Sequence, residues 1–366
     1  MQAASKWQTL PGLMRRARWV SLFVVLSAVG YLLLWPSPID PRAWEPSPAM
    51  PMTGPFALNQ RLAAVEWWAK QLIGPEAITI DAKGRVVSGL RDGRVVRLEV
   101  GSDAPEVLVD TGGRPLGLAY HPDGRLIICD AHKGLLALDS NGELQTLATG
   151  EGGVPFAFAD DLDIDPQGVI YFSDASARFS IEHFTEDLLE HQTTGRLLKY
   201  DPATKQVTRI ADGFSFANGV ALGPDAQWLV VAEMGTYRLW RIWLKGEQAG
   251  KKELFAELPG FPDNVRYSKS RRVFWIAIGS PRNPLVDALA GAPLMRQVIT
   301  RLPRAVQPAA ERHAFVIAVD EHGKVVESLQ HRAPDSYSPI ASAFEHDGWL
   351  YLGSFIREGV ARVRLP

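Results

Sequence analysis

Short apolar runs alternate with polar turns along most of the chain after residue 73. Six stretches share one pattern, an apolar strand, a polar turn and a second apolar strand: ITIDAKGRVVSGL, LAYHPDGRLIICD, LDIDPQGVIYFSD, VALGPDAQWLVVAE, VRYSKSRRVFWIAIG and SAFEHDGWLYLGS. A further strand often follows, as in GRVVRLEV and GRLLKYD. Units of roughly 42–58 residues with about four strands are typical of propeller blades. The pattern therefore predicts an all-β fold over residues 61–366, a six-bladed β-propeller with four-stranded blades.

The turns also set a common register for the predicted blades. Counting eight residues back from the turn position of each unit reaches, in chain order, Glu76, Leu116, Asp160, Asn218, Asp263 and Ile340. Each of these residues should begin the innermost strand of its blade, and innermost strands run side by side around the central channel. Four oxygen-bearing side chains would then meet at one mouth of that channel. The alternative is that strand ends are merely polar and face water, but four such positions out of six in one register favour convergence.

The densest acidic stretch, FADDLDIDPQG at residues 158–168, contains one of these positions. An EF-hand calcium loop starting at Asp161 would need glycine at its sixth place and a carboxylate at its twelfth, where the chain has proline and phenylalanine. The register instead directs Asp160 to the channel mouth. We expect Asp163 and Asp165 to be structural, the latter in a turn, while Asp161 could serve either the site or a backbone hydrogen bond.

The N-terminal part of the chain has a different character. Arg15, Arg16 and Arg18 precede an uncharged run at residues 19–35. As a helix this run would cover about 25 Å, the short end of what a bilayer span needs. Arginines next to a span tend to stay cytoplasmic. We therefore expect a single-pass signal-anchor with residues 1–18 in the cytoplasm and an extracytoplasmic propeller, in the periplasm or a lumen.

The chain after the apolar run bears on this interpretation. A cleaved signal peptide is the alternative to an anchor, but no small-x-small cleavage site follows, and the run exits into WPSPIDP. Residues 36–60 are rich in proline and should form an extended tether.

Two insertions interrupt the rhythm of the predicted blades. Residues 178–194 have helical spacing between two strands of blade three, and residues 281–312 contain an amphipathic helix that we expect between blades five and six. The apolar residues of the 281–312 segment could form a lid or a membrane-facing surface, or simply pack as a loop.

Composition narrows the chemistry further. A net charge of −2 at pH 7 gives no reason to expect nucleic acid as a partner. Cys129 is the only cysteine, which excludes an intrachain disulfide, and its apolar neighbours in LIIC indicate a core thiol. The chain has no G-x-S-x-G motif, so no protein nucleophile is visible.

The chain resembles the strictosidine synthase-like family, within the wider group that includes gluconolactonases and paraoxonases. The matching stretches cover nearly all of residues 74–365 and include GPEAITID, RPLGLAYHPDGRLIICDAHKGLL, GRLLKYDPAT, FANGVALGPD, LPGFPDNV, SPRNPLVD and EHDGWLYLGS. The resemblance implies a six-bladed propeller, and anchored members of the group also carry an N-terminal membrane helix.

The resemblance also implies a metal at the channel mouth, Ca²⁺ or another divalent ion. Carried over by motif, its ligands are Glu76, Asp160, Asn218 and Asp263, with Asn264 adjacent. The chain departs from the family where Asp160 replaces the asparagine usual in many relatives. A second departure is Ala341, which occupies the place of the catalytic glutamate of plant strictosidine synthases. Without that carboxylate for proton transfer, we reject strictosidine synthesis as the activity.

These observations favour a calcium-dependent hydrolase that acts on a small, apolar ester or lactone. His132, Asp160 and Asp161 are the candidate bases, and Arg114 could bind an anionic group of the substrate. His132 could equally be a surface histidine, and a loop arginine is more often merely solvated. The alternatives to a hydrolase are a membrane-tethered binding or scaffold propeller with a structural metal, and a degenerate relative with no metal.

Overall fold

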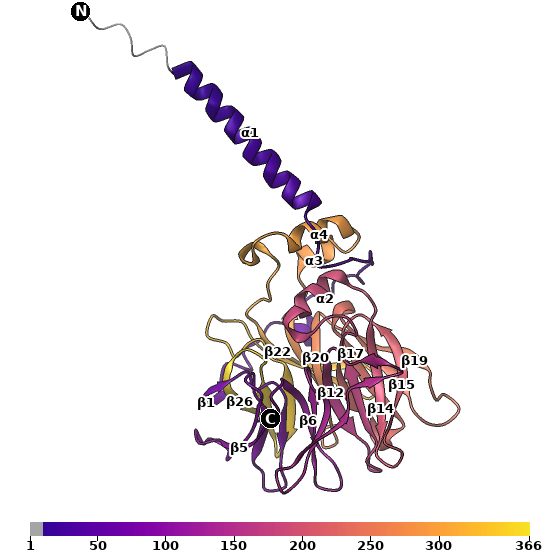
Figure 1. Cartoon of the computed structure of the whole chain (residues 1–366). Coiled ribbons are helices and arrows are strands. Elements are labelled where there is room, and N and C mark those ends of the chain that lie inside the picture. The colour runs from indigo at the N-terminus through magenta and orange to yellow at the C-terminus, as the bar shows by residue number, and fades with distance from the viewer. Residues whose placement is uncertain (1–9) are drawn as a thin grey trace, which may run out of the picture.

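The computed structural model describes residues 10–366 and contains six four-stranded antiparallel sheets (Figure 1). The first strands of successive sheets contact one another in a closed ring, β2, β6, β12, β16, β20 and β24, with β24 contacting β2 again. This arrangement is the six-bladed β-propeller predicted from the turns.

Each blade runs outward from the channel in strand order. Blades one and two contain β2 (Ile78–Ile80), β3 (Val86–Gly89), β4 (Arg94–Leu98) and β5 (Glu106–Asp110), then β6 (Pro115–Tyr120), β7 (Leu126–Asp130), β8 (Gly134–Leu138) and β9 (Leu144–Ala148). Blades three and four contain β12 (Ala159–Ile164), β13 (Ile170–Asp174), β14 (Gly195–Asp201) and β15 (Gln206–Phe214), then β16 (Ala217–Leu222), β17 (Trp228–Glu233), β18 (Arg238–Trp243) and β19 (Lys252–Glu257). Blade five contains β20 (Gly260–Ser268), β21 (Val273–Pro281), β22 (Ala314–Asp320) and β23 (Val325–His331). A small hairpin, β10 (Gly150–Glu151) and β11 (Val154–Pro155), lies between blades two and three.

The sixth blade joins the two ends of the propeller. It contains β24 (Ser342–His346), β25 (Trp349–Gly353) and β26 (Glu358–Arg364), and its outermost strand is β1 (Glu66–Ile73) from the N-terminal side. Trp67 of β1 is paired with Ala361 of β26 in antiparallel register. This pairing closes the ring, a device that the turn pattern did not reveal.

The turns between the first two strands of a blade are held by aspartate side chains. Asp165 Oδ1 accepts hydrogen bonds of 2.9 Å from the backbone N–H groups of Gln167 and Val169. Asp81 Oδ1 does the same in blade one. A carboxylate that binds its own turn in this way favours a tight reversal between strands. Asp165 is therefore a turn residue, as expected.

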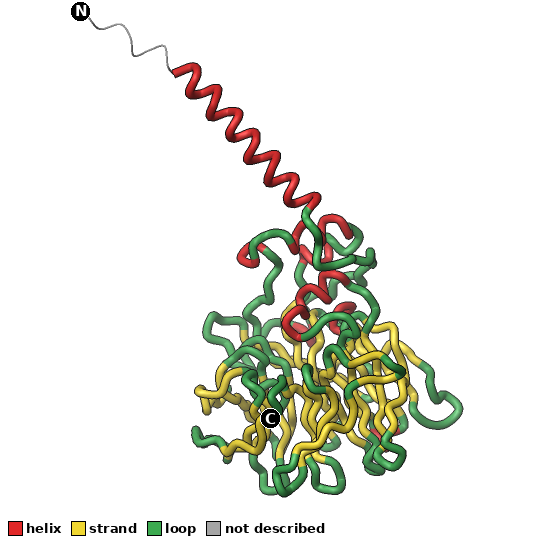
Figure 2. Tube along the Cα trace, viewed as in Figure 1, coloured by secondary structure: helices red, strands yellow, loops and turns green. Residues whose placement is uncertain are grey.

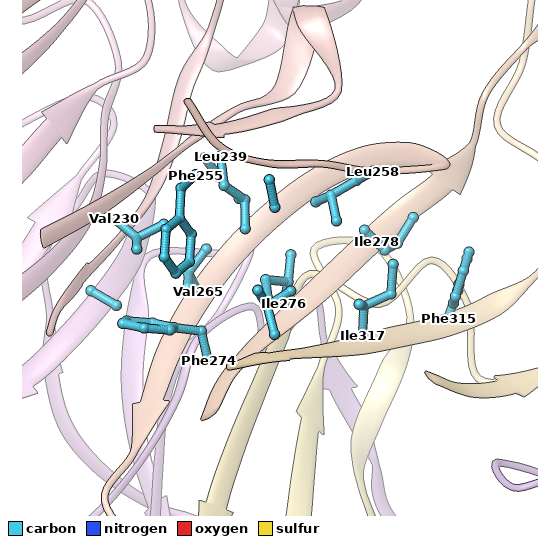
Figure 3. Packing of buried hydrophobic residues seen from close by; sticks show 14 of the residues in the cluster. Val230, Leu239, Phe255, Leu258, Val265, Phe274, Ile276, Ile278, Phe315 and Ile317 are labelled. Atoms are coloured by element: carbon cyan, nitrogen blue, oxygen red, sulfur yellow. The ribbon is translucent and has the colours of Figure 1, made fainter. Parts of the chain in front are cut away.

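The core lies between adjacent blades. Figure 3 shows one such layer, in which Val230, Phe255, Phe274, Ile276 and Ile317 from blades four and five pack together. Each of these side chains is at least nine-tenths buried, and full burial of such a side chain is worth roughly 1.5–3 kcal/mol. Several layers of this kind between successive sheets hold the ring together.

Both insertions are helical, and Figure 2 shows their helices gathered at one end of the propeller. The first contains η2 (Ile181–His183) and α2 (Phe184–Glu190), between the second and third strands of blade three. The second contains α3 (Pro284–Ala288), α4 (Pro293–Thr300) and η5 (Arg304–Val306). Short 3₁₀ turns elsewhere are η1 (Gly54–Phe56), η3 (Pro224–Ala226) and η4 (Met234–Thr236).

The expected place of the second insertion was wrong. Residues 281–312 lie inside blade five, between β21 and β22, and not between blades five and six. The reason is that residues 314–331 form the third and fourth strands of blade five.

The N-terminal helix α1 (Leu10–Leu34) is longer than the uncharged run from which it was predicted, and residues 1–9 of the basic segment lie outside the described residues. Residues Met14–Leu34 are apolar and long enough to cross a membrane. The helix projects away from the propeller (Figure 1).

The proline-rich segment after α1, which was expected to be extended, contains no helix or strand over residues 36–53 and packs along the propeller. The N–H of Arg42 donates to the carbonyl of Glu190 (2.9 Å), and that of Trp44 donates to the carbonyl of Ala290 (3.2 Å). Further along, Phe56 is buried in the core layer of blades four and five. The segment therefore connects α1 to both insertions.

The inter-blade layers should dominate stability. Phe274 packs within 6 Å, between ring centroids, of Trp228, Phe255 and Tyr267. Replacing Phe274 by alanine should lower the free energy of unfolding by about 3–5 kcal/mol because it leaves a cavity between blades. Chemical denaturation of the full chain in detergent, followed by tryptophan fluorescence, measures the change.

Leu254→Ala provides the control for this prediction. Leu254 lies on β19 near the same layer but is half exposed, so its truncation should cost less than about 1 kcal/mol. Equal losses for the two variants would contradict a core located between the blades.

Candidate metal centre

The polar residues of the predicted register lie at the start of the innermost strands. Asp160, Asn218 and Asp263 are near the first residues of β12, β16 and β20, and Glu76 lies just before β2. Asn264 follows Asp263. All five side chains belong to residues that are at most 5% exposed. The strand starts therefore place these five residues in the interior at one end of the ring.

Asn218 and Asp263 meet because the two strands that carry them approach closely. Gly219 faces the backbone of β20, and a Cβ on this residue would lie only 2.6 Å from the carbonyl oxygen of Asp263. Only glycine tolerates this approach. The Asn218 side chain acts on Asp263 and opposes the rise of its pKa. The Asn-Gly pair thus brings a side-chain amide beside a carboxylate.

Several polar atoms of this cluster have no partner among the described residues. They are Asp160 Oδ1, Asn218 Oδ1 and both side-chain atoms Oδ1 and Nδ2 of Asn264. A buried oxygen without a hydrogen bond costs about 1–3 kcal/mol. Several unpartnered oxygens in one buried cluster therefore indicate a binding site for a ligand that is not part of the chain, such as a cation.

The pKa values of the carboxyl groups also indicate a site for a positive ion. Burial raises the pKa of Glu76 to about 7, with the charge of Arg114 opposing this rise and that of Asp161 adding to it. Burial, followed by the charge of Glu76, raises the pKa of both Asp160 and Asp263 well above the usual range. Acidic groups in such surroundings keep their protons unless a positive charge joins them.

Arg114 supplies part of that positive charge. Its Nη2 lies 3.3 Å from Glu76 Oε2, and its guanidinium also donates to the carbonyls of Gly74 and Phe355. The residue is 5% exposed and is not among the residues that line the cavity described below. Three carboxylates, Glu76, Asp160 and Asp263, with one guanidinium leave two negative charges if all are ionised, which matches a divalent cation.

Asp161 is separately neutralised. Both of its oxygens are 2.6 Å from the guanidinium of Arg266, and Oδ2 also accepts from the N–H of Val220 (3.0 Å). Its neighbour Asp163 accepts from the N–H of Leu222 (2.8 Å) and is structural, as expected. These bonds tie β12 to β16 and β20. Asp161 therefore lies in a structural ion pair that the sequence did not reveal, because Arg266 is 105 residues away.

His132 lies apart from the cluster. Its side chain is 38% exposed, and its Nε2 is 2.7 Å from Glu182 of η2. It does not line the cavity described below. His132 is thus hydrogen-bonded to the first insertion.

A cavity of about 330 Å³ opens above the cluster, and Asp263 is part of its lining. Its walls come from α2, from the 281–312 insertion and from the ends of blades four, five and six. The apolar lining residues are Phe184, Leu188, Leu189, Met234, Phe261, Val286, Pro308, Ala309, Ala310 and Phe355. The cavity therefore has largely apolar walls and an acidic group at its base.

The donor set fits a hard cation. Ca²⁺ prefers carboxylate and amide oxygens, and these are the atoms present. In residues 10–366 no three acidic, histidine or cysteine side chains approach closely enough to form a metal site. Glu76, Asp160 and Asp263 would therefore have to draw together around an ion, with the amide oxygens of Asn218 and Asn264 as further ligands.

These features define the class of the protein, a six-bladed β-propeller with a buried acidic cluster beneath an apolar cavity. Residues 160–247 match the family model for strictosidine synthase, and residues 54–98 match that for the N-terminal part of strictosidine synthase-like proteins.

Whole-chain relatives identify the family. The chain is 35% identical to the strictosidine synthase-like protein 3 of Arabidopsis thaliana over 323 residues, which cover 80% of this chain and 83% of the relative. It is 33% identical to the adipocyte plasma membrane-associated protein of Rattus norvegicus over 370 residues, which cover 94% and 97%. The chain belongs to the strictosidine synthase-like family.

Solved structures share the fold at low sequence identity. A gluconolactonase from Xanthomonas campestris superimposes with a TM-score of 0.60 at 18% identity, covering 90% of this chain and 97% of that one. The calcium-binding protein regucalcin from Agrobacterium tumefaciens has a TM-score of 0.56 at 17% identity, covering 81% and 92%. These similarities confirm the propeller architecture.

A cation that binds the folded site should stabilise the protein. Added Ca²⁺ at a hundredfold excess over its Kd should raise the unfolding free energy by about 2.7 kcal/mol, measured as a rise in melting temperature of chelator-treated full chain. Asp263→Asn should lose most of this rise because it removes one of the negative charges.

Glu345→Gln serves as the matched control. Glu345 is a buried carboxylate that accepts a hydrogen bond from Trp275 of blade five, so its replacement should lower the starting melting temperature yet keep the calcium-dependent rise. A rise of the same size in Asp263→Asn and in the native chain would contradict the proposed ligand set.

Proposed function

We propose that the protein is a membrane-anchored, calcium-dependent hydrolase of apolar esters or lactones. The observation that carries this proposal is that Asp263, which lines the apolar cavity, belongs to a buried cluster in which oxygens of Asp160, Asn218 and Asn264 have no partner among the described residues. The gluconolactonase and the calcium-binding protein that share the fold support it by analogy.

The proposed site has two parts, a set of cation ligands and the apolar walls of the cavity. The cation would be held by five side chains, those of Glu76, Asp160, Asn218, Asp263 and Asn264. When bound, the cation would polarise the substrate carbonyl and stabilise negative charge on its oxygen. The apolar walls of the cavity would hold the rest of the substrate and exclude bulk water.

Proton transfer would fall to Asp160. Its carboxylate would hold the cation through one oxygen and take a proton from the attacking water on the other, and Oδ1 has no partner among the described residues. Asp161 is bound on both oxygens by Arg266, and His132 pairs with Glu182 at the surface. Asp160 is thus the candidate base that the geometry favours among the three.

No protein nucleophile competes with this mechanism at the cavity. The lining in residues 10–366 contains Thr185 and Ser280 but no histidine or cysteine that could activate them. Ser280 Oγ donates to the carbonyl of Pro281 and accepts from the N–H of Glu311. A direct attack by water is therefore the simpler route.

Strictosidine synthesis remains excluded from the proposal. Ala341 is fully buried, and its carbonyl accepts from the N–H of Asn264 at 3.0 Å. The position is thus next to the candidate ligand Asn264, yet a methyl group cannot transfer a proton.

Activity should depend on the cation and on its ligands. The full chain should hydrolyse at least some aryl esters or lactones, lose activity with a chelator and regain it with Ca²⁺. Asp263→Asn should lower kcat/KM by at least about 100-fold, since even groups that support metal ligands are worth 10–100-fold. Steady-state kinetics over a broad substrate panel make the measurement.

Glu345→Gln, away from the site, should keep kcat/KM near the native value at a temperature where it is folded. The absence of turnover for every ester and lactone, in protein that still binds Ca²⁺, would support the alternative of a binding or scaffold propeller.

The proposed topology rests on α1. The candidate span Met14–Leu34 is about 32 Å long as a helix, of which the uncharged part from Trp19 onward covers about 24 Å, the short end of what a bilayer span needs. Arg15, Arg16 and Arg18 should hold its N-terminal side in the cytoplasm. The propeller would then lie on the opposite side of the membrane.

Reporter fusions test this orientation. Alkaline phosphatase joined after Pro366 should be active, whereas a cytoplasm-dependent reporter at the same place should be inactive. Replacing the three arginines by glutamate should reduce this difference, because the charge bias would be lost. An active cytoplasmic reporter on the native chain would refute the orientation.

A further inference from the structure

The end of α1 touches the second insertion. Arg301, at the C-terminal end of α4, donates from Nη1 to the carbonyl of Leu32 at 2.8 Å. Leu32 lies two residues before the end of the apolar span. A group bonded there sits at the depth where a spanning helix leaves the bilayer.

The insertion is held rigidly in this position. Arg296 of α4 is almost fully buried and donates to the carbonyls of Leu189, Ala290 and Arg42. Ile39 packs with Leu189 and Ile299. The linker, α2 and the insertion therefore form one packed unit, so the span and the propeller have a defined relation.

This unit carries exposed apolar side chains. Leu294 and Met295 on α4 are 72% and 47% exposed, and Val306 on η5 is 62% exposed. Arg301 lies beside them in the chain, and the side chain of Arg304 is 82% exposed. Apolar residues flanked by arginines are the composition of a segment that rests in the interface of a bilayer with anionic lipids.

The same insertion forms a wall of the cavity. Val286, Arg304, Gln307 and Pro308 line it, opposite Phe184 and Leu188 of α2. The cavity is therefore at the end of the propeller from which α1 departs (Figure 1).

We propose that the insertion 281–312 lies in the interface of the bilayer that α1 crosses, and that the cavity takes a lipophilic substrate directly from this bilayer. The inference rests on the membrane anchoring and hydrolysis proposed above. The exposed apolar residues belong to the insertion that contacts the end of the span through Arg301 and Leu32. We therefore expect lipid to cover this surface.

Spin labels can locate the insertion in the full chain, reconstituted in vesicles of phosphatidylcholine and phosphatidylserine. Cys129 is fully buried, so a nitroxide reagent should react with an introduced cysteine and leave the native chain unlabelled. Labels at Leu294→Cys and Val306→Cys should be relaxed more by oxygen than by a water-soluble nickel complex. Val107→Cys, on a half-exposed strand position of blade one, should show the opposite preference.

A fourth label distinguishes the possible failures. Val25→Cys lies in the middle of α1 and should report lipid. Water at both 25 and 294 would refute the anchoring itself, whereas lipid at 25 with water at 294 would overturn only the present inference. Strong dipolar broadening between labels at 294 would also overturn it, because it would assign the surface to a second copy of the chain.

A substrate comparison tests the second half of the inference. The variant with Leu294→Asp and Met295→Asp should hydrolyse a long-chain ester carried in vesicles severalfold more slowly than the native chain, with no change for a short, water-soluble ester. Equal effects on the two esters, or no effect, would refute delivery from the bilayer. Failure of the native chain to hydrolyse either ester would count against the proposed hydrolysis and leave the spin-label result standing.

Discussion

Pairing of β1 with β26 joins the two ends of the propeller, and the buried acidic cluster depends on that closure. In an open array of blades, Glu76 of blade one and Asp263 of blade five would lie far apart. In the closed ring, β2 and β20 are both in contact with β24, and the charge of Glu76 acts on both Asp160 and Asp263. Burial of the apolar layers between blades stabilises the closed ring, and this stabilisation offsets the unfavourable approach of the carboxylates.

Burial of several carboxylates close together is energetically unfavourable. In this structure arginine side chains offset that charge to two different degrees. Asp161 is balanced by a bidentate arginine, Arg266, and this pair ties three inner strands together. Among residues 10–366, the three carboxylates Glu76, Asp160 and Asp263 have a single salt bridge, between Glu76 and Arg114. A cluster that stays underbalanced inside a protein is a common mark of a functional site. The same end of the channel thus holds a neutralised structural ion pair and an acidic cluster whose charge is only partly balanced.

The helical insertions give the site its surroundings. They cover the channel mouth, supply most of the apolar wall and bind the segment that leads to α1. A proline-rich segment free in solution would have left the orientation of the propeller open. Its hydrogen bonds and the buried Arg296 remove that freedom. The position of the cavity relative to the span is therefore a property of the folded chain.

By itself the sequence determined the propeller, its six blades and the register of its polar residues. It could do so because turn chemistry and strand alternation act over a few residues, and an offset of eight residues from a turn stays within one hairpin. The positions of Arg114 beneath Glu76, Arg266 beside Asp161 and residues 281–312 inside blade five were decided only by the tertiary structure. The pairing of the closing strand β1 and the packing of the linker were likewise decided only by the tertiary structure. Each depends on a partner far away in the chain, and local patterns carry no information about which distant groups will share a buried volume.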